Sequence, residues 1–247
     1  MNQPAQHRSA YERYPFLTPE EFAEACHYLD RKYCQATLGA LRKEWRLHVH
    51  NALDSSYGHH DGLITFLQIT RSLEDRAVDH DLAAQLGSIN LAGPTTTADQ
   101  MMVELEESDK EVLPISSRTR ASRASFQARH VVYEIHLHPT YQAPCLWFSL
   151  HNLPFGQSAM DIETVFRWLV PNQFENALRG QGPIGGISID HHPVTGVPTF
   201  FVHPCLLGDA MTGFDCSKED YLMVWLGLVG GCVGLWVPKE MAMTIGA

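Results

Sequence analysis

Residues 130–150 read HVVYEIHLHPTYQAPCLWFSL and carry the clearest structural signal in the chain. Every second residue from 131 to 137 is a large apolar or aromatic residue, whereas the other face carries Glu134, His136 and His138. A period of two predicts a β-strand with one face in a core. The apolar run after the short proline-containing turn predicts a second strand. The stretch as a whole therefore predicts an antiparallel hairpin.

Residues 18–39, upstream of this hairpin, predict a helix. Thr18 is a favourable N-cap, and Pro19 fits the first helical position. Glu21 completes a capping box with the threonine. Gly39 follows the periodic residues, so we expect the helix to stop there.

Other segments predict short strands and helices around the hairpin. Strands are expected at WRLHVHNAL (45–53), GLITFLQITRSL (62–73), GISI (186–189) and TFFV (199–202), and helices at DIETVFRWLV (161–170) and from Lys218 onward. We expect Asp161 near the start of its helix and Pro171 at its end. Strands grouped in the middle of the chain, with helices on either side, favour an α+β domain with an antiparallel sheet.

Composition narrows the classes of function. The 247 residues carry a formal net charge of −10, which disfavours nonspecific binding to nucleic acid or anionic lipid. No phosphate-binding glycine motif of the GxxxxGK[ST] or GxGxxG type occurs, so nucleotide binding and other cofactors are not expected. The N-terminal stretch lacks the apolar core of a secretory signal. The apolar run at 222–237 is shorter than the roughly 20 residues of a membrane span, so we expect no stable membrane insertion.

Residues 88–125 differ in composition from the rest of the chain. They hold an acidic cluster followed by a basic one and few large apolar side chains. Such a segment cannot bury enough apolar surface to offset the entropy lost on ordering. We therefore predict a single domain, spanning residues 1–247, that carries a disordered insertion at about 88–125.

A cysteine at the end of the last predicted strand is the candidate nucleophile. The stretch 199–208 reads TFFVHPCLLG, so Cys205 follows the point at which Pro204 ends the strand. His203, two residues earlier, could favour the thiolate. The chain has six cysteines and no CxxC pair, so reduced thiols are expected. An ordinary loop cysteine remains an equal alternative on spacing alone.

Two rival site types have weaker support. A papain-like hydrolase needs a histidine after its cysteine, and none follows His203, although other cysteine hydrolases stay open. His136 and His138 share a strand face, and histidine doublets stand at 59–60 and 191–192. No third ligand falls at a recognised zinc spacing. Histidines on the polar face of a strand are usually surface residues, so no metal site is predicted.

Three motifs together resemble one enzyme family. They are HPTYQAPCLWFSL (138–150), DHHPVTGVPTFFVHPC (190–205) and YLMVWLGLVGGCVGLWVP (221–238). In this order they resemble the autophagy-related protein 10 family of E2-like conjugating enzymes, over roughly residues 130–240. The resemblance implies a variant E2 fold, in which a curved antiparallel sheet is flanked by helices and the cysteine lies just past a strand.

The resemblance also implies a reaction and partners. Cys205 would receive the ubiquitin-like modifier autophagy-related protein 12 from an activating enzyme, autophagy-related protein 7, by transthioesterification. A lysine of autophagy-related protein 5 would then attack the thioester, in autophagosome formation and without a separate ligase. The protein is expected in the cytoplasm, with recruitment to the pre-autophagosomal site.

The sequence departs from ordinary ubiquitin E2 enzymes near the cysteine. Those enzymes carry a His-Pro-Asn tripeptide, but each His-Pro pair here, at 138–139, 192–193 and 203–204, is followed by another residue. Tyr141 matches a tyrosine of the family motif and is the first candidate for an accessory catalytic residue, with packing at a strand end as its alternative role.

Three alternatives stay open. The sister enzyme autophagy-related protein 3, which lipidates its modifier, also carries His-Pro-Cys but continues differently from the Leu206-Leu207-Gly208 found here. The chain could also be a noncatalytic binding module that recruits partners at a sheet edge. The third alternative is a cysteine hydrolase, which would react with electrophilic probes without an activating enzyme.

Overall fold

The fold is described from a computed structural model. The described residues are 11–53, 63–73, 128–179, 186–204 and 207–242. The predicted insertion at about 88–125 and the candidate nucleophile Cys205 lie outside them.

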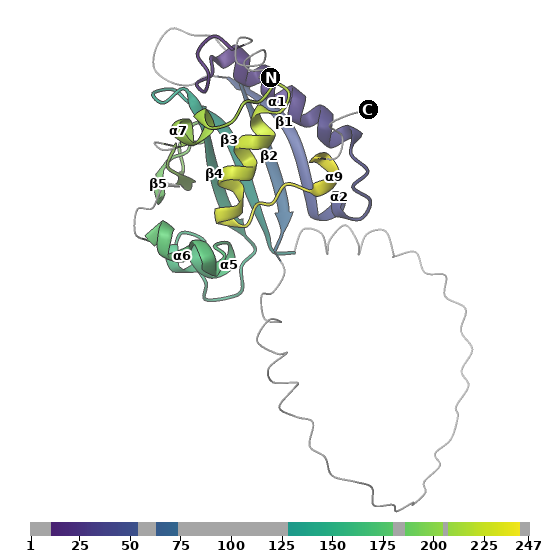
Figure 1. Cartoon of the computed structure of the whole chain (residues 1–247). Coiled ribbons are helices and arrows are strands. Elements are labelled where there is room, and N and C mark those ends of the chain that lie inside the picture. Colours follow the sequence, from purple (N-terminus) through teal and green to yellow (C-terminus); the bar gives the residue numbers. More distant parts are fainter. Residues whose placement is uncertain (1–10, 54–62, 74–127, 180–185, 205–206, 243–247) are drawn as a thin grey trace, which may run out of the picture. The chain divides into compact units, whose positions relative to one another are not determined.

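The described strands form a six-stranded antiparallel sheet in the order β1-β2-β3-β4-β6-β5 (Figure 1). The strands are β1 Trp45–Leu53, β2 Leu63–Ser72, β3 His130–His138, β4 Ala143–His151, β5 Ile187–His191 and β6 Pro198–Val202. The hairpin expected in residues 130–150 is confirmed, because β3 pairs with β4 and places Tyr133 opposite Phe148. The sheet is curved and does not close into a barrel, in agreement with the predicted fold class.

The order of the last two strands brings β6 into the interior of the sheet. It pairs with β4 on one side and with β5 on the other, so β5 is an edge strand. The chain reaches β5 from β4 through two short helices. The strand that leads to Cys205 is therefore held by hydrogen bonds on both sides.

Helices lie against one face of the sheet, with α8 across its middle in Figure 1. The helices are α1 Pro19–Gln35, α2 Leu41–Glu44, α5 Ile162–Trp168, α6 Asn172–Arg179, α7 Leu207–Thr212, α8 Tyr221–Val229 and α9 Lys239–Ala242, with a 3-10 turn, η4, at Gly230–Val233. Asp161, which was expected near the start of its helix, is the N-cap of α5, and its side chain accepts hydrogen bonds from two backbone N–H groups. α6, after Pro171, was not predicted.

The start of α1 confirms the predicted capping box, and its end corrects the predicted stop. The Thr18 side chain accepts from the backbone N–H of Glu21, and the Glu21 carboxylate accepts from the backbone N–H of Thr18. The helix ends at Gln35 because Ala36 turns to an extended conformation. Gly39, with φ +53°, lies in the turn before α2 instead.

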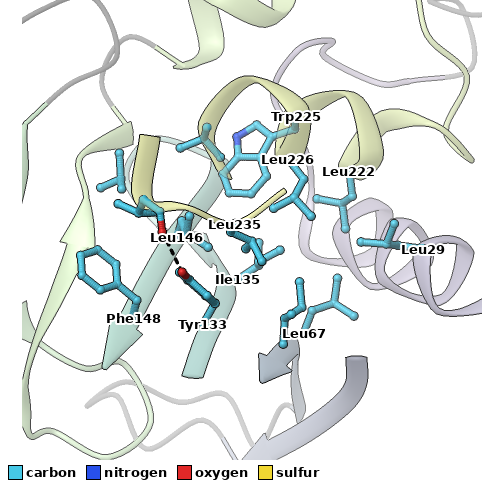
Figure 2. Packing of buried hydrophobic residues seen from close by; sticks show 14 of the residues in the cluster. Leu29, Leu67, Tyr133, Ile135, Leu146, Phe148, Leu222, Trp225, Leu226 and Leu235 are labelled. Atoms are coloured by element: carbon cyan, nitrogen blue, oxygen red, sulfur yellow. Dashed lines mark hydrogen bonds between the residues drawn. The ribbon is translucent and has the colours of Figure 1, made fainter. Parts of the chain in front are cut away.

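The apolar run at 222–237 is the centre of the core. It forms α8 and η4, and Trp225 and Leu226 are fully buried against Leu67, Ile135 and the sheet (Figure 2). Gly230 is required here because a Cβ would collide with the carbonyl oxygen of Leu235. None of the helices in the described part of the chain is long and apolar enough to cross a membrane.

One buried hydroxyl connects the sheet to this apolar run. Tyr133 on β3 is fully buried, and its hydroxyl donates a 2.7 Å hydrogen bond to the carbonyl oxygen of Val233 (Figure 2). Burial raises the pKa of Tyr133 to about 12, so the hydroxyl stays protonated and remains a donor. The contact satisfies a carbonyl near the end of η4 that would otherwise be orphaned.

Candidate active site

β6 delivers the chain to the predicted nucleophile. Phe200 and Val202 of this strand face the helical core, whereas Phe201 faces the opposite side of the sheet. The strand ends at Val202, and the backbone N–H of His203 donates to the carbonyl of Gly186 at 3.2 Å. Pro204 is buried, and the chain is described again at α7. The described chain thus stops at Pro204 and resumes at Leu207, and the role of the Cys205 thiol stays a prediction.

Tyr141 lies beside the residues that precede Cys205. It occupies the β3–β4 turn, residues 139–142, and is 38% exposed. Its ring centroid is 5.5 Å from that of His203, in an edge-on arrangement. The structure therefore places the second predicted site residue next to the His-Pro that leads to the first. It is not packed away in the core, although its catalytic role is untested.

Hydrogen bonds from several directions hold the turn that carries Tyr141. The backbone N–H of Gln142 donates to the carbonyl of His138 at 2.8 Å, which closes the turn. The carbonyl of Gln142 accepts from the backbone N–H of Leu17, also at 2.8 Å, so the N-terminal segment fastens the turn from outside. Gln142 has φ +49°, a strained value for a residue other than glycine.

His138 supplies the third support of this turn. Its Nδ1 accepts the backbone N–H groups of Thr140, at 3.2 Å, and Tyr141, at 3.4 Å. Burial lowers the pKa of His138 and the nearby His203 lowers it further, against an opposing effect of Asp190. The neutral ring is thus favoured, with the lone pair of Nδ1 toward the turn.

The N-terminal segment before α1 also reaches the helix that follows Cys205. The hydroxyl of Tyr14 lies 2.7 Å from the carbonyl oxygen of Met211 and 2.6 Å from that of Phe214, so its single proton serves one at a time. A Cβ on Gly208 would meet the ring of Phe16 at 3.0 Å. Sequence reasoning gave this segment no role, although its three aromatic residues at positions 11, 14 and 16 were a signal for packing.

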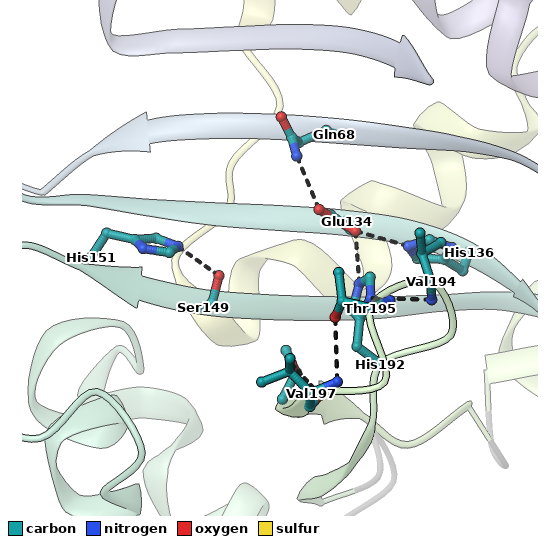
Figure 3. A network of polar contacts seen from close by, with 10 residues as sticks. Gln68, Glu134, His136, Ser149, His151, His192, Val194, Thr195 and Val197 are labelled. Carbon is teal, nitrogen blue, oxygen red and sulfur yellow. Dashed lines mark hydrogen bonds and ion pairs between the residues drawn. The ribbon is translucent and has the colours of Figure 1, made fainter. Parts of the chain in front are cut away.

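The carboxylate of Glu134, which is partly buried, occupies the face of the sheet opposite the helices (Figure 3). Glu134 Oε2 accepts from His136 Nε2 at 3.0 Å and from His192 Nε2 at 2.7 Å, and Oε1 accepts from Gln68 Nε2 at 2.9 Å. Burial alone would raise the pKa of Glu134, but these hydrogen bonds outweigh it and hold the pKa well below its usual range. Burial lowers the pKa of His136, so a neutral ring donates to the carboxylate.

The burial of His136 corrects the expectation of a surface residue. It is 2% exposed because the turn after β5, which begins at His192, lies over this part of β3 (Figure 3). The sequence could not show this, since the covering residues are distant in the chain. His138, on the same strand face, contacts Tyr141 instead of joining the carboxylate.

Glu134, His136 and His192 offer metal-type ligand atoms within 4.8 Å of one another. The tautomer of His192 argues against a metal: its Nδ1 accepts the backbone N–H groups of Val194, at 3.3 Å, and Thr195, at 3.2 Å. A neutral ring with this arrangement carries its proton on Nε2, the atom that would have to bind the ion. The three residues therefore suit a hydrogen-bonded clamp on the β5–β6 turn.

Ring contacts connect this clamp to the turn of Tyr141. The ring of Trp147 lies 5.6 Å from that of His192 and 4.8 Å from that of Phe201. The Phe201 ring is 6.0 Å from His203, which in turn contacts Tyr141. One face of the sheet thus carries a continuous row of rings from the Glu134 carboxylate to the residues that precede Cys205.

Comparisons with known proteins show the family to which the chain belongs. Residues 21–240 match the family described as "Autophagocytosis associated protein, active-site domain", a range that includes Tyr141 and Cys205. The "Ubiquitin-like-conjugating enzyme ATG10" of Gibberella zeae is 53% identical over 237 residues, which cover 94% of this chain and 98% of that protein. The human "Ubiquitin-like-conjugating enzyme ATG10" is 26% identical over 156 residues, 61% of this chain and 66% of that protein. The chain therefore belongs to the ATG10 family of autophagy enzymes and is an E2-like transferase of a ubiquitin-like conjugation pathway.

Proposed function

We propose that Cys205 carries autophagy-related protein 12 as a thioester and transfers it to a lysine of autophagy-related protein 5. The modifier would come from autophagy-related protein 7, in the cytoplasm and at the site where autophagosomes form. The observation that supports this proposal best is the position of Tyr141. Three sets of hydrogen bonds fix the turn that carries Tyr141, and the Tyr141 ring lies beside His203. His203 is two residues before the proposed nucleophile.

The proposed reaction has two steps. In the first, the Cys205 thiolate attacks the thioester between the modifier and the activating enzyme, and the thiolate of that enzyme leaves. In the second, a neutral lysine amine attacks the carbonyl carbon of the Cys205 thioester. The Cys205 thiolate leaves, an isopeptide bond forms, and the amine loses a proton to solvent. We assign to the Tyr141 hydroxyl the donation of a hydrogen bond to the developing oxyanion.

The first prediction tests the nucleophile by reconstituted charging. Purified chain, activating enzyme, ATP and the modifier are combined and resolved on gels with and without reductant. The wild type should give an adduct that thiol reductant removes. Cys205→Ser should give an adduct that survives reductant, because an oxygen ester is not cleaved by thiols, and Cys205→Ala should give none.

Cys34 provides the matched control, because it is the exposed one among the cysteines that the structure describes. Cys34→Ser should charge as the wild type does. A reductant-sensitive adduct that persists in Cys205→Ala, or its absence from the wild type, would contradict the proposal. Conjugation to phosphatidylethanolamine vesicles in place of the protein target would favour the lipidating alternative.

A further inference from the structure

We propose that His138 is a positioning residue, whose neutral Nδ1 holds Tyr141 in place for transfer of the modifier from Cys205. This inference rests on the proposed function and adds a residue to it. His138 does not touch the reacting atoms. It acts through the turn at residues 139–142.

The first support is the pair of hydrogen bonds to one ring nitrogen. The N–H groups of Thr140 and Tyr141 both point at His138 Nδ1, at 3.2 Å and 3.4 Å. The backbone of Tyr141 is therefore bound directly to the imidazole. A proton on Nδ1 would set donor against donor and release both contacts. Only the neutral ring can therefore accept these two backbone hydrogen bonds.

The second support is the contact between rings. The Tyr141 ring lies 4.7 Å from the His138 ring on one side and 5.5 Å from the His203 ring on the other. His138 thus restricts the position of both the backbone and the ring of Tyr141. The rest of the turn has its own anchor at Leu17, so loss of His138 should loosen Tyr141 more than it loosens the fold.

The charged and titratable neighbours of His138 come from three elements. Tyr141 is on the turn, His203 follows β6, and Asp190 is on β5. Burial lowers the pKa of His138 most, His203 lowers it further, and Asp190 opposes them. Because the net effect is a lowered pKa, the His138 ring is neutral near neutral pH and takes up a proton in more acidic solution.

Two substitutions of His138 separate the contribution of its hydrogen-bond acceptor, Nδ1, from that of its ring contact with Tyr141. In His138→Asn, the amide oxygen can accept the same backbone N–H groups, as in an Asx-turn. In His138→Phe, the ring contact remains and the acceptor is lost. Each variant is first charged on Cys205 and then chased with the target protein in a single turnover, so that charging and transfer are measured separately.

We expect charging within twofold of the wild type in both variants. Transfer should fall by about tenfold in His138→Phe, because small displacements of a catalytic group cost large factors in rate. His138→Asn should restore transfer to within about threefold of the wild type. In a Tyr141→Phe background, His138→Phe should cause little further loss, since both act through the same hydroxyl.

A pH series gives a readout that a merely structural role would not move. The transfer rate of the wild type is divided by that of His138→Asn at each pH from 8 to 5, which cancels protonation of the attacking amine. The ratio should fall on the acid side, as His138 takes up a proton and releases the turn. Thermal unfolding of each protein at each pH confirms that it is folded.

Three results would overturn the inference. They are transfer by His138→Phe at the wild-type rate, equal damage from Asn and Phe, and a pH-independent ratio. If His138→Phe does not fold, the pH dependence of the wild-type to His138→Asn transfer ratio and the transfer rate of His138→Asn still test the inference. Failure of the wild type to charge would instead overturn the proposed function, and is seen before any transfer is measured.

Discussion

Glu134 shows how one residue can fasten distant parts of the chain. Its carboxylate is bound by three side chains, one from β2, one from β3 itself and one from the turn after β5, and both histidines reach the same oxygen. A buried carboxylate is costly unless such donors compensate for lost water. Because the donors are satisfied together, removal of the acceptor leaves several of them unpaired.

Glu134→Gln should therefore destabilise the fold at neutral pH by about 2 kcal/mol, since hydrogen bonds to charged groups are worth roughly 1.5–3 kcal/mol. The sign of the pH effect follows from the lowered pKa of Glu134. The stabilisation is fully present above the pKa of an unfolded glutamate, about 4.3, and is lost as pH falls below it. Urea unfolding of wild type and variant at pH 7 and pH 3.5 measures this difference.

Glu219→Gln is the control for that comparison, because Glu219 is exposed. Its unfolding midpoint should match the wild type at both pH values. A Glu134→Gln penalty that stays constant between pH 7 and pH 3.5 would mean that the charge of Glu134 is not what stabilises the network.

At the scale of single elements, α1 gives the clearest prediction. Thr18→Ala removes the side-chain half of the capping box and should cost about 1 kcal/mol in the free energy of unfolding. Thr18→Ser keeps the hydroxyl and should cost little. Chemical denaturation of the three proteins measures both differences. Equal stability of Thr18→Ala and wild type would show that solvent replaces the cap.

The same elements show what the sequence could and could not predict. The hairpin at 130–150 and the capping box at Thr18 were predictable because their signals are local. The insertion of β6 between β4 and β5 was not, since strand pairing at that distance depends on tertiary packing. α6 was not predicted because a proline ends one helix and can equally precede the next: the carbonyl of Pro171 accepts from the N–H of Phe174 at the start of α6.

The candidate site was predictable to a similar extent. Tyr141 and His203 were chosen or noted from sequence, and the structure brings them together. The support from His138 could not be predicted, because it depends on the conformation in which the His138 side chain accepts a backbone N–H of the turn that follows its strand. The clamp at His192 required knowledge of where the β5–β6 turn lies.

At the scale of the whole molecule, the segment before α1 contacts elements that are distant from it in the sequence. Tyr14 and Phe16 precede α1, yet they meet α7, which follows Cys205. Leu17, from the same segment, binds the turn of Tyr141. The N-terminal segment therefore contacts both the turn that carries Tyr141 and the helix that follows the proposed nucleophile. Loss of one of its contacts should loosen α7 locally before it affects the core.

Tyr14→Phe tests this coupling, because it removes only the hydroxyl that binds the carbonyls of Met211 and Phe214. One hydrogen bond is worth about 1 kcal/mol, so amide exchange in α7 should become about fivefold faster. Hydrogen exchange in α8, which is built on the apolar core, should stay unchanged. Tyr28→Phe, which loses an exposed hydrogen bond to Glu24, should leave α7 unaffected. An equal increase in the amide exchange rates of α7 and α8 would instead show that Tyr14 stabilises the fold as a whole and does not specifically stabilise α7.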